Sequence, residues 1–180
     1  DKVDPNPTGE IKQVVSDELQ KPVETIFADF ENESLAAASL GQVHRARYRG
    51  EDVAVKVLRP GVPQLVQIDL RIVQGVLNVL NMFISNSPIL KSFITVFNEF
   101  RRVIVREMDF ELEARNVKKF QRNFAHEEFV VIPKVYDEVS TKKVIVLEYL
   151  EGIKINEVER IEQMGVDIDL IIQCLVKIYI

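Results

Sequence analysis

A lysine inside an apolar strand is the residue of this chain with the clearest capacity for chemistry. Lys56 interrupts the β-branched run VAVKVL at residues 53–58. A lysine is almost never fully buried unless a partner compensates its charge, so we expect a carboxylate to lie against it. The chemistry that this indicates is electrostatic: an ammonium group oriented by a carboxylate. A lysine that faces outward from a half-exposed strand is the alternative.

The apolar stretch AAASLGQV at residues 36–43 precedes this lysine at an informative distance. Protein kinases begin their nucleotide-binding lobe with G-x-G-x-x-G-x-V and return in a V-A-I-K strand, whose lysine meets the α- and β-phosphates. The positions that fall on this frame are Ala36, Ala38, Gly41, Val43 and Lys56. Alanine carries a Cβ penalty where glycine adopts a positive φ, so we expect a stiffer loop that covers a nucleotide differently. An ordinary strand or helix is the alternative interpretation.

The residues between these two motifs have the pattern of a β-hairpin. Side chains alternate in character along residues 43–48, and the apolar run follows a glycine-containing turn at residues 49–52. His44 belongs to the first strand and His126 to an expected loop, and neither has companions at metal-ligand spacing. We therefore expect both histidines to be structural, and we expect no metal site built by the protein alone.

Six ordered segments are informative beyond this kinase frame. They are AAAS at residues 36–39, GQVHRA at 41–46, VAVKV at 53–57, RPGV at 59–62, EMDF at 107–110 and EARN at 113–116. Together they resemble the UbiB family of aarF-domain (ADCK-type) atypical kinases. The resemblance implies an α+β fold: a protein-kinase-like N-lobe with a small antiparallel sheet, a helical insertion and the start of a helical C-lobe. It also implies a role in ubiquinone or other prenyl-quinone metabolism.

The resemblance assigns a set of residues to the binding of ATP or ADP. They are Ala36, Ala37, Ala38, Ser39, Gly41, Val43, Ala54, Lys56, Glu107, Asp109, Glu113, Glu148, Tyr149 and Leu150. Glu113 matches the glutamate of the kinase αC helix that pairs with the strand lysine. Residues 148–152 occupy the hinge position, where backbone N–H and C=O groups bind the adenine edge. Mg²⁺ is expected only with the nucleotide, with most of its protein ligands outside this chain.

Glu107 and Asp109 match the family's E-x-D motif, but their spacing raises a geometric problem. Residues two apart on an α-helix are rotated by about 200°, so both carboxylates cannot face one site from an unbroken helix. Either the helix bends there, or one carboxylate faces a segment upstream of this chain. A solvated charged face is the alternative for Glu111 and Arg115, which lie four residues apart.

The patterning divides the chain into three parts. Residues 1–30 form a helical extension with helices at 10–19 and 23–28, and residues 31–150 form the kinase-like N-lobe. Within the lobe, residues 64–124 hold the helical insertion and the αC-like helix, as helices at 64–84 and 92–124 joined by a turn at 85–88. Strands are expected at residues 135–139 and 144–148. Residues 151–180 are the hinge exit and the start of a truncated C-lobe.

The strings that perform phosphoryl transfer in kinases are missing from the chain. Neither the catalytic-loop Asp with its Asn nor the D-F-G Asp occurs before Ile180. No catalytic residue is therefore expected within these residues, and the chain alone is expected to be inactive. The uncapped apolar helix at the end and the opening DKVDPNP lead us to expect that both ends are cuts within a longer protein.

Composition narrows the class of protein further. The net charge of −5 argues against a nucleic-acid binder. The single cysteine, Cys174, excludes a disulfide scaffold and favours a reducing compartment, such as a bacterial cytoplasm, a mitochondrion or a plastid, with a possible membrane-peripheral location. Residues 65–84 carry six polar side chains, so this stretch is an amphipathic helix rather than a membrane span of about 20 apolar residues.

Two functions remain open at this point. One is an ATP-binding lobe of a UbiB-type kinase or ATPase that supports prenyl-quinone biosynthesis or lipid homeostasis, with quinone- or lipid-biosynthesis proteins or a membrane surface as partners. The other is a non-catalytic pseudokinase scaffold, whose helical insertion binds a protein partner or a membrane surface.

Overall fold

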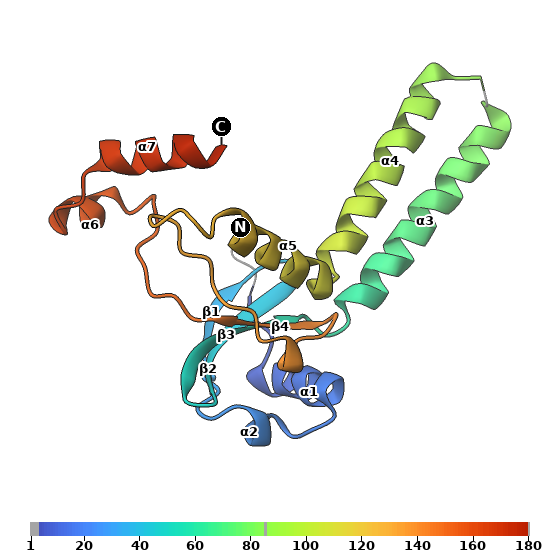
Figure 1. Cartoon of the computed structure of the whole chain (residues 1–180). Coiled ribbons are helices and arrows are strands. Elements are labelled where there is room, and N and C mark those ends of the chain that lie inside the picture. Colours follow the sequence, from blue (N-terminus) through green and yellow to red (C-terminus); the bar gives the residue numbers. More distant parts are fainter. Residues whose placement is uncertain (1–3, 85, 180) are drawn as a thin grey trace.

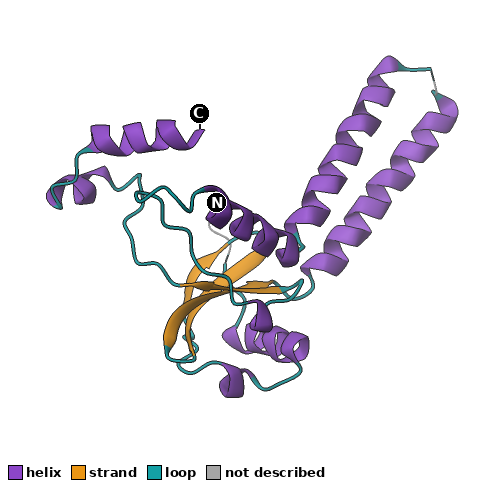
Figure 2. Ribbon diagram, in the orientation of Figure 1, coloured by secondary structure: helices purple, strands orange, loops and turns teal. Residues whose placement is uncertain are grey.

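A four-stranded antiparallel sheet forms the centre of the computed structural model, which describes residues 4–84 and 86–179. The strands are β1 (Ser34–Ala37), β2 (Gly41–Tyr48), β3 (Glu51–Leu58) and β4 (Val144–Glu148), in that spatial order. Helices cover both faces of the sheet (Figures 1 and 2), which confirms the expected α+β class. Residues 1–3, Ser85 of the expected turn and Ile180 lie outside the described residues.

The hairpin of β2 and β3 is the most regular part of the sheet. Eight residue pairs run from Gly41 opposite Leu58 to Tyr48 opposite Glu51. The turn consists of Arg49 and Gly50 alone, with φ values of 51° and 86°. Two consecutive positive φ values give the primed turn that matches the twist of paired strands. The expected four-residue turn was therefore too long, because Glu51 already pairs within the strand.

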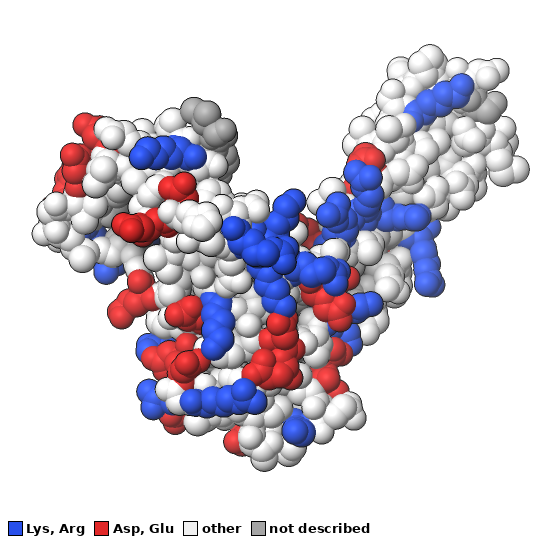
Figure 3. All heavy atoms as spheres, in the orientation of Figure 1, with Lys and Arg blue, Asp and Glu red and all other residues white. Residues whose placement is uncertain are grey.

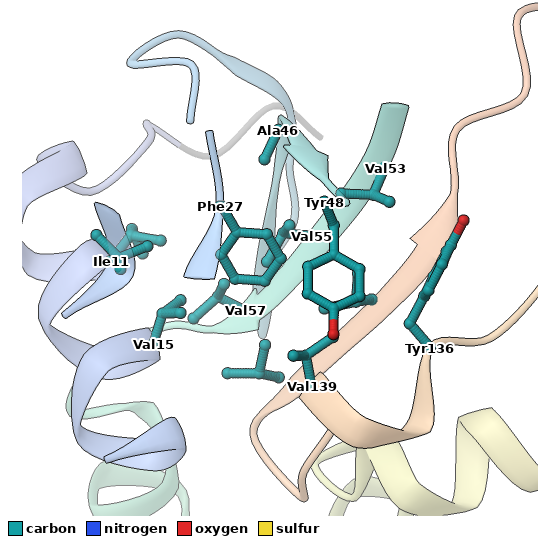
Figure 4. Packing of buried hydrophobic residues seen from close by; sticks show 13 residues of the cluster. Ile11, Val15, Phe27, Ala46, Tyr48, Val53, Val55, Val57, Tyr136 and Val139 are labelled. Atoms are coloured by element: carbon teal, nitrogen blue, oxygen red, sulfur yellow. The ribbon is translucent and has the colours of Figure 1, made fainter. Parts of the chain in front are cut away.

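The main core lies between the sheet and the helices α1 (Thr8–Leu19) and α2 (Val23–Ile26). Figure 4 shows Phe27 from the segment after α2 facing the valines of β3, with Tyr48 and Tyr136 completing an aromatic row. The fully or almost fully buried members include Ile11, Val15, Val23, Phe27, Val53, Val55, Val57, Val144 and Val146. This layer fixes β3, and with it the backbone that carries Lys56.

His44 belongs to a buried polar network on the same face of the sheet. Its Nδ1–H donates to the carbonyl of Glu31 at 2.9 Å, because a carbonyl can only accept, and its Nε2 accepts from the side-chain amide of Gln42 at 2.9 Å. The side-chain oxygen of Gln42 accepts from the N–H of Asn6 at 2.8 Å. Desolvation by burial lowers the pKa of His44 below its ordinary 6.5. The expectation that this histidine is structural is confirmed.

This network makes stability depend on pH in one direction. Below about pH 6.5 the unfolded chain binds a proton at His44 that the folded chain does not accept until a lower pH. The free energy of unfolding should therefore be fully retained above pH 6.5 and fall as the pH drops below it. Urea unfolding at pH 7.5 and 5.5 measures the effect. His44→Gln should reduce the difference between the free energies of unfolding at the two pH values. His126→Gln, at an exposed position, should leave that difference unchanged. The same pH dependence in both variants would contradict the assignment to His44.

Two long helices form an antiparallel hairpin that projects from the sheet, in the region of the expected insertion (Figure 1). Its helices are α3 (Val62–Phe83) and α4 (Pro88–Glu107), and Leu70 and Leu90 are the buried side chains. Ser87 caps α4 by accepting the N–H of Leu90 at 3.3 Å, with proline at the first helical position.

The expected single helix over residues 92–124 is wrong in one important respect. The helix begins earlier, at Pro88, and it ends at Glu107, after which α5 (Phe110–Asn123) starts as a separate helix. The side chain of Asp109 causes the break, because its Oδ1 accepts the N–H groups of Glu111 at 3.1 Å and Leu112 at 3.3 Å. An aspartate that caps a new helix cannot continue the previous one.

The expected strand over residues 135–139 is also wrong. Only Val135 forms a bridge, opposite Leu147, and Asp137–Val139 is a short 3₁₀-helix. Ser140 explains the change: its hydroxyl donates to the carbonyl of Tyr136 at 2.7 Å and accepts the N–H of Val146 at 3.0 Å. The side chain thus takes the hydrogen bond that a second strand would have made.

Two further helices, α6 (Val158–Gln163) and α7 (Ile168–Tyr179), follow the sheet. Among residues 4–84 and 86–179, none of the helices combines the length and the apolar character that crossing a bilayer requires.

Candidate functional site

An ion pair between β3 and α5 is the centre of the candidate site. The ammonium group of Lys56 donates to both carboxylate oxygens of Glu113, at 2.9 and 2.6 Å. Each side chain is about one third exposed, at 33% and 35%. The expected pairing of these two residues is therefore present, and water still reaches both charges.

The ring of Phe110 lies against the ammonium group of this ion pair. The Lys56 ammonium lies 4.8 Å from the ring centroid, within the range of a cation–π contact. Phe110 is 1% exposed and packs with Leu58, Ala114, Val135 and Ile145 in a second core. Because Phe110 and Glu113 are three residues apart, they share one face of α5. Sequence analysis did not predict this role of Phe110, although the residue is the last of the EMDF segment and its three-residue spacing from Glu113 could have indicated it.

The alanine-rich segment forms β1 and the turn into β2. No positive φ occurs at Ala36, Ala37 or Ala38; in the described chain the non-glycine residues with positive φ are Gln20, Asp29 and Arg49. The expected Cβ penalty therefore does not arise at these alanines. Gly41 is different, because a Cβ there would lie 3.4 Å from the ring of Phe110 and 3.4 Å from the carbonyl of Val57. That glycine permits close packing against α5.

Arg59 fixes the position of this turn, and sequence analysis did not predict it. Its guanidinium donates to the carbonyl of Ala38 at 3.3 Å, to Oδ1 of Asn6 at 2.6 Å and to the carbonyl of Asp4 at 2.9 Å. Its backbone N–H donates to the carbonyl of Leu40 at 2.9 Å. One side chain thus joins the turn after β1 to the segment before α1.

A cavity of about 430 Å³ opens beside the ion pair. Its lining residues are Lys56, Val103, Arg106, Glu107, Asp109, Leu112, Glu113 and Asn116. Both carboxylates of the E-x-D motif reach one cavity because the chain breaks between α4 and α5, so the first of the two geometric alternatives is correct. Glu111 and Arg115 instead form an exposed pair at 3.9 Å, as the solvated-face interpretation expects.

Basic side chains gather on α5 and on the adjoining end of α4. Figure 3 shows lysine and arginine concentrated over α5 and the adjoining end of α4, although the whole chain is acidic. The sequence positions on these helices are Arg101, Arg102, Arg106, Arg115, Lys118, Lys119 and Arg122. The cavity itself is lined by two cations, Lys56 and Arg106, and by three carboxylates, Glu107, Asp109 and Glu113.

The aspartate that separates the two helices should also be a measurable determinant of stability. Asp109→Ala removes the acceptor of two helix N–H groups and should lower the free energy of unfolding by about 1 kcal/mol. Asp109→Asn retains a capping oxygen and should cost less. Chemical denaturation of both variants tests this, and an alanine variant as stable as the asparagine variant would show that the cap is not what sustains the break.

The segment after β4 is held by backbone and side-chain contacts from two sides. The N–H of Tyr149 donates to the carbonyl of Asp52 at 3.1 Å, and the guanidinium of Arg45 lies 4.6 Å from the ring centroid of Tyr149. Arg45 also donates to Oδ2 of Asp52 at 2.6 Å, and this hydrogen bond lowers the pKa of the Asp52 carboxyl. These contacts fix the path of the chain as it leaves the sheet.

The expected site residues lie in three places. Lys56, Glu107, Asp109 and Glu113 line the cavity. Val43 pairs with Lys56, and Ala54 lies two residues before it on β3, so these side chains share the α5 face of the sheet. Residues 36–39 end β1 and begin the turn after it, and residues 148–150 end β4 and begin the segment after it; both lie on edge strands of the sheet and outside the lining of the cavity.

Comparison with known proteins gives a consistent result. The model of the ABC1 atypical kinase-like domain matches residues 1–180. The chain is 40% identical over 168 residues to Protein ACTIVITY OF BC1 COMPLEX KINASE 8, chloroplastic, of Arabidopsis thaliana, covering 93% of this chain and 22% of that protein. It is 34% identical over 174 residues to AarF domain-containing protein kinase 1 of Xenopus laevis, covering 96% of this chain and 33% of that protein.

A solved structure extends the comparison to three dimensions. Rv3197 of Mycobacterium tuberculosis, determined as a complex with erythromycin, matches with a TM-score of 0.72 and 28% identity. The match covers 87% of this chain and 39% of that one. The chain therefore spans well under half the length of these relatives, and its sheet and helices have the arrangement of a kinase-like N-lobe.

Proposed function

This chain belongs to the ABC1 atypical kinase-like family, and on that premise we propose that it is the ATP-binding lobe of an atypical kinase or ATPase. The observation that carries the proposal is the pair of Lys56 and Glu113 beside an open cavity. A lysine ammonium has three donors. Two of them point to Glu113, which leaves the third for a phosphate oxygen.

The other residues have complementary roles in this proposal. Glu113 and Phe110 hold the ammonium group in place, so that the lysine is already ordered when the nucleotide arrives. The segment 36–39 and Gly41 cover the phosphates. Val43, Ala54 and the backbone of residues 148–150 border the adenine. Mg²⁺ enters as part of the Mg-nucleotide complex.

We also propose a cellular role for the whole protein that contains this chain. By its resemblance to the UbiB family, that protein supports prenyl-quinone biosynthesis or lipid homeostasis. The chloroplastic relative supports a plastid, or a comparable reducing compartment, as the location.

Thermal unfolding of the intact protein tests nucleotide binding directly. A ligand that binds only the folded state stabilises it by about 2.7 kcal/mol at a hundred times its Kd. Mg-ATP should therefore raise the melting temperature in a concentration-dependent way, and Mg²⁺ with inorganic phosphate should not match the effect. No shift at millimolar Mg-ATP would count against the proposal.

A specific surface favours a second candidate, a non-catalytic scaffold. Twelve apolar side chains on α3 and α4 are each more than half exposed: Leu65, Ile68, Ile72, Val76, Val79, Met82, Phe83, Ile89, Phe93, Val96, Phe100 and Val103. All except Met82 recur at a spacing of three and four residues, which places each set along one stripe of its helix. The basic residues Arg71, Lys91 and Arg102 fall outside these stripes.

The occupant that fits this apolar face is an amphipathic protein helix. Ridges at this spacing suit helix packing, whereas a helix on an anionic membrane carries its cations beside the apolar face. A photo-crosslinking residue at position 96 in the intact protein should react with such a helix, and the same probe at Asn98 should not. If the probe at position 96 reacted only with lipid, the partner of the apolar face would be a membrane and not a protein helix. If both probes reacted equally, the scaffold function would be contradicted.

A further inference from the structure

Polar side chains interrupt the seam along which α3 and α4 pack together. The less exposed side chains of each helix recur at intervals of three and four residues, which is the spacing of a packed helix seam. From residue 66 onward they are Val66, Leu70, Gln74 and Leu77 on α3, and Leu90, Ile94, Phe97 and Ile104 on α4. The exposed Arg101 occupies the position that this series requires between Phe97 and Ile104. Gln74 and Arg101 therefore stand where apolar contacts would close the seam.

A cavity of about 370 Å³ opens at this interruption. Its lining residues are Gln67, Leu70, Arg71, Gln74, Gly75, Asn78, Arg101 and Val105. They include none of the residues that line the cavity beside Lys56, so the two cavities are separate sites. The volume lies at the lower end of the range of about 300–1,000 Å³ that small-molecule sites occupy.

The charge of this second cavity is positive. Arg71 reaches it from α3 and Arg101 from α4, and its lining contains no carboxylate. The adjacent Arg102 pairs with Glu99 at 2.7 Å, whereas no such ion pair joins Arg71 or Arg101 to a carboxylate within residues 4–84 and 86–179. A guanidinium group stays protonated in proteins, so the cavity carries two positive charges that the described side chains leave uncompensated.

We propose that this cavity binds a small organic phosphate monoester, at a site independent of the proposed nucleotide site. A phosphate monoester carries about 1.5–2 negative charges at pH 7, which two guanidinium groups balance and one carboxylate ligand would not. Each planar guanidinium can donate two parallel hydrogen bonds to a phosphate group.

The uncharged lining residues suit the rest of such a ligand. The side-chain oxygen of Asn78 accepts from Gln74 at 3.0 Å, so the amide N–H groups of Asn78 can donate to the ligand. Leu70 and Val105 supply an apolar surface for its carbon skeleton. A site with a few polar groups on an apolar lining is the usual composition of a small-molecule pocket.

The experiment is calorimetric titration of the intact protein with phenyl phosphate, with and without saturating Mg-ATP. Benzoate keeps the ring but carries a single charge, and it should bind about tenfold more weakly or worse. Arg71→Gln and Arg101→Gln each remove charge-assisted hydrogen bonds, so each should weaken the binding of phenyl phosphate about tenfold or more. Mg-ATP should leave this binding unchanged, because the two cavities share no residue.

Arg102→Gln is the matched control. Arg102 follows Arg101 on α4, but it pairs with Glu99 and lies outside the lining of the cavity, so its replacement should keep the affinity. Thermal unfolding separates a ligand-binding role from a structural one. Because like charges repel, Arg101→Gln should not lower the melting temperature of the free protein, but it should abolish the rise that phenyl phosphate causes in the wild type. If Arg101→Gln does not fold, the exposed Arg71 provides the same test.

A phosphate monoester can be a soluble molecule or a lipid headgroup, and vesicles of phosphatidylcholine with phosphatidic acid distinguish the two. Binding of phenyl phosphate that depends on both arginines supports a soluble ester. Sedimentation with these vesicles alone, lost in Arg101→Gln, would support the same chemistry on a lipid. Competition by Mg-ATP, equal affinity for benzoate, or equal weakening by Arg102→Gln would overturn the proposal. So would wild-type protein that binds neither phenyl phosphate nor the vesicles.

Discussion

Replacing Lys56 by methionine should lower nucleotide turnover by the intact protein about 10²–10³-fold, the usual effect of removing one charged or polar group that stabilises a transition state. Methionine fills a similar volume and can pack on Phe110, so the fold should be kept. The ion pair is one third exposed, and its loss should reduce the free energy of unfolding by about 1 kcal/mol or less. Steady-state turnover with Mg-ATP, together with urea unfolding, separates the two effects.

Lys118 provides the matched control for this substitution. It also pairs with a carboxylate, that of Asp137 at 2.5 Å, and its side chain is 38% exposed, but it lies outside the lining of the cavity. Lys118→Met should therefore change stability by a similar small amount and leave turnover intact. Equal turnover in the wild-type and Lys56→Met proteins would mean that the lysine is only a structural partner of Glu113.

Phe110→Ala should be the most destabilising single substitution near the site, with a loss of about 3–5 kcal/mol in the free energy of unfolding. The ring is 1% exposed and fills the space between α5 and the sheet. Its removal leaves a cavity next to the Lys56 ammonium and beside Gly41, where an added Cβ would lie 3.4 Å from the ring. Chemical denaturation of the purified variant gives the difference.

The same helix offers the control. Phe120 is 52% exposed and stacks only on Phe124, with ring centroids 6.0 Å apart. Phe120→Ala should cost about 0.5–1 kcal/mol. If both phenylalanine variants lost the same stability, α5 would not be anchored to the sheet through Phe110, and the positioning of Glu113 would need another explanation.

Local pattern and kinase-like spacing predicted the parts of the site that depend on one strand or one helix. The pairing of Lys56 with Glu113 came from the resemblance to the UbiB family. The hairpin and the inward lysine on β3 follow from side-chain alternation and turn chemistry. These features are encoded within short segments, so a single sequence is enough to predict them.

The errors arose where one polar side chain overrides a periodic pattern. Asp109 ends one helix by capping the next, and Ser140 replaces a ladder hydrogen bond, yet both lie inside stretches whose apolar spacing continues. Propensity cannot show which backbone group such a side chain will contact, because the partner is chosen by the folded arrangement. The hydrogen bonds of Arg59 to Asn6 and Asp4 join segments far apart in the sequence, so no local sequence pattern predicts them.

The backbone amides of the intact protein report most directly on whether the α5 face of the sheet binds a nucleotide. Hydrogen exchange should be measured with and without saturating Mg-ATP. Slower exchange at residues 36–43 and 148–151, with α3 and α4 unchanged, is the result that this account predicts. Unchanged exchange in both segments, or protection confined to the α3–α4 hairpin, would contradict it.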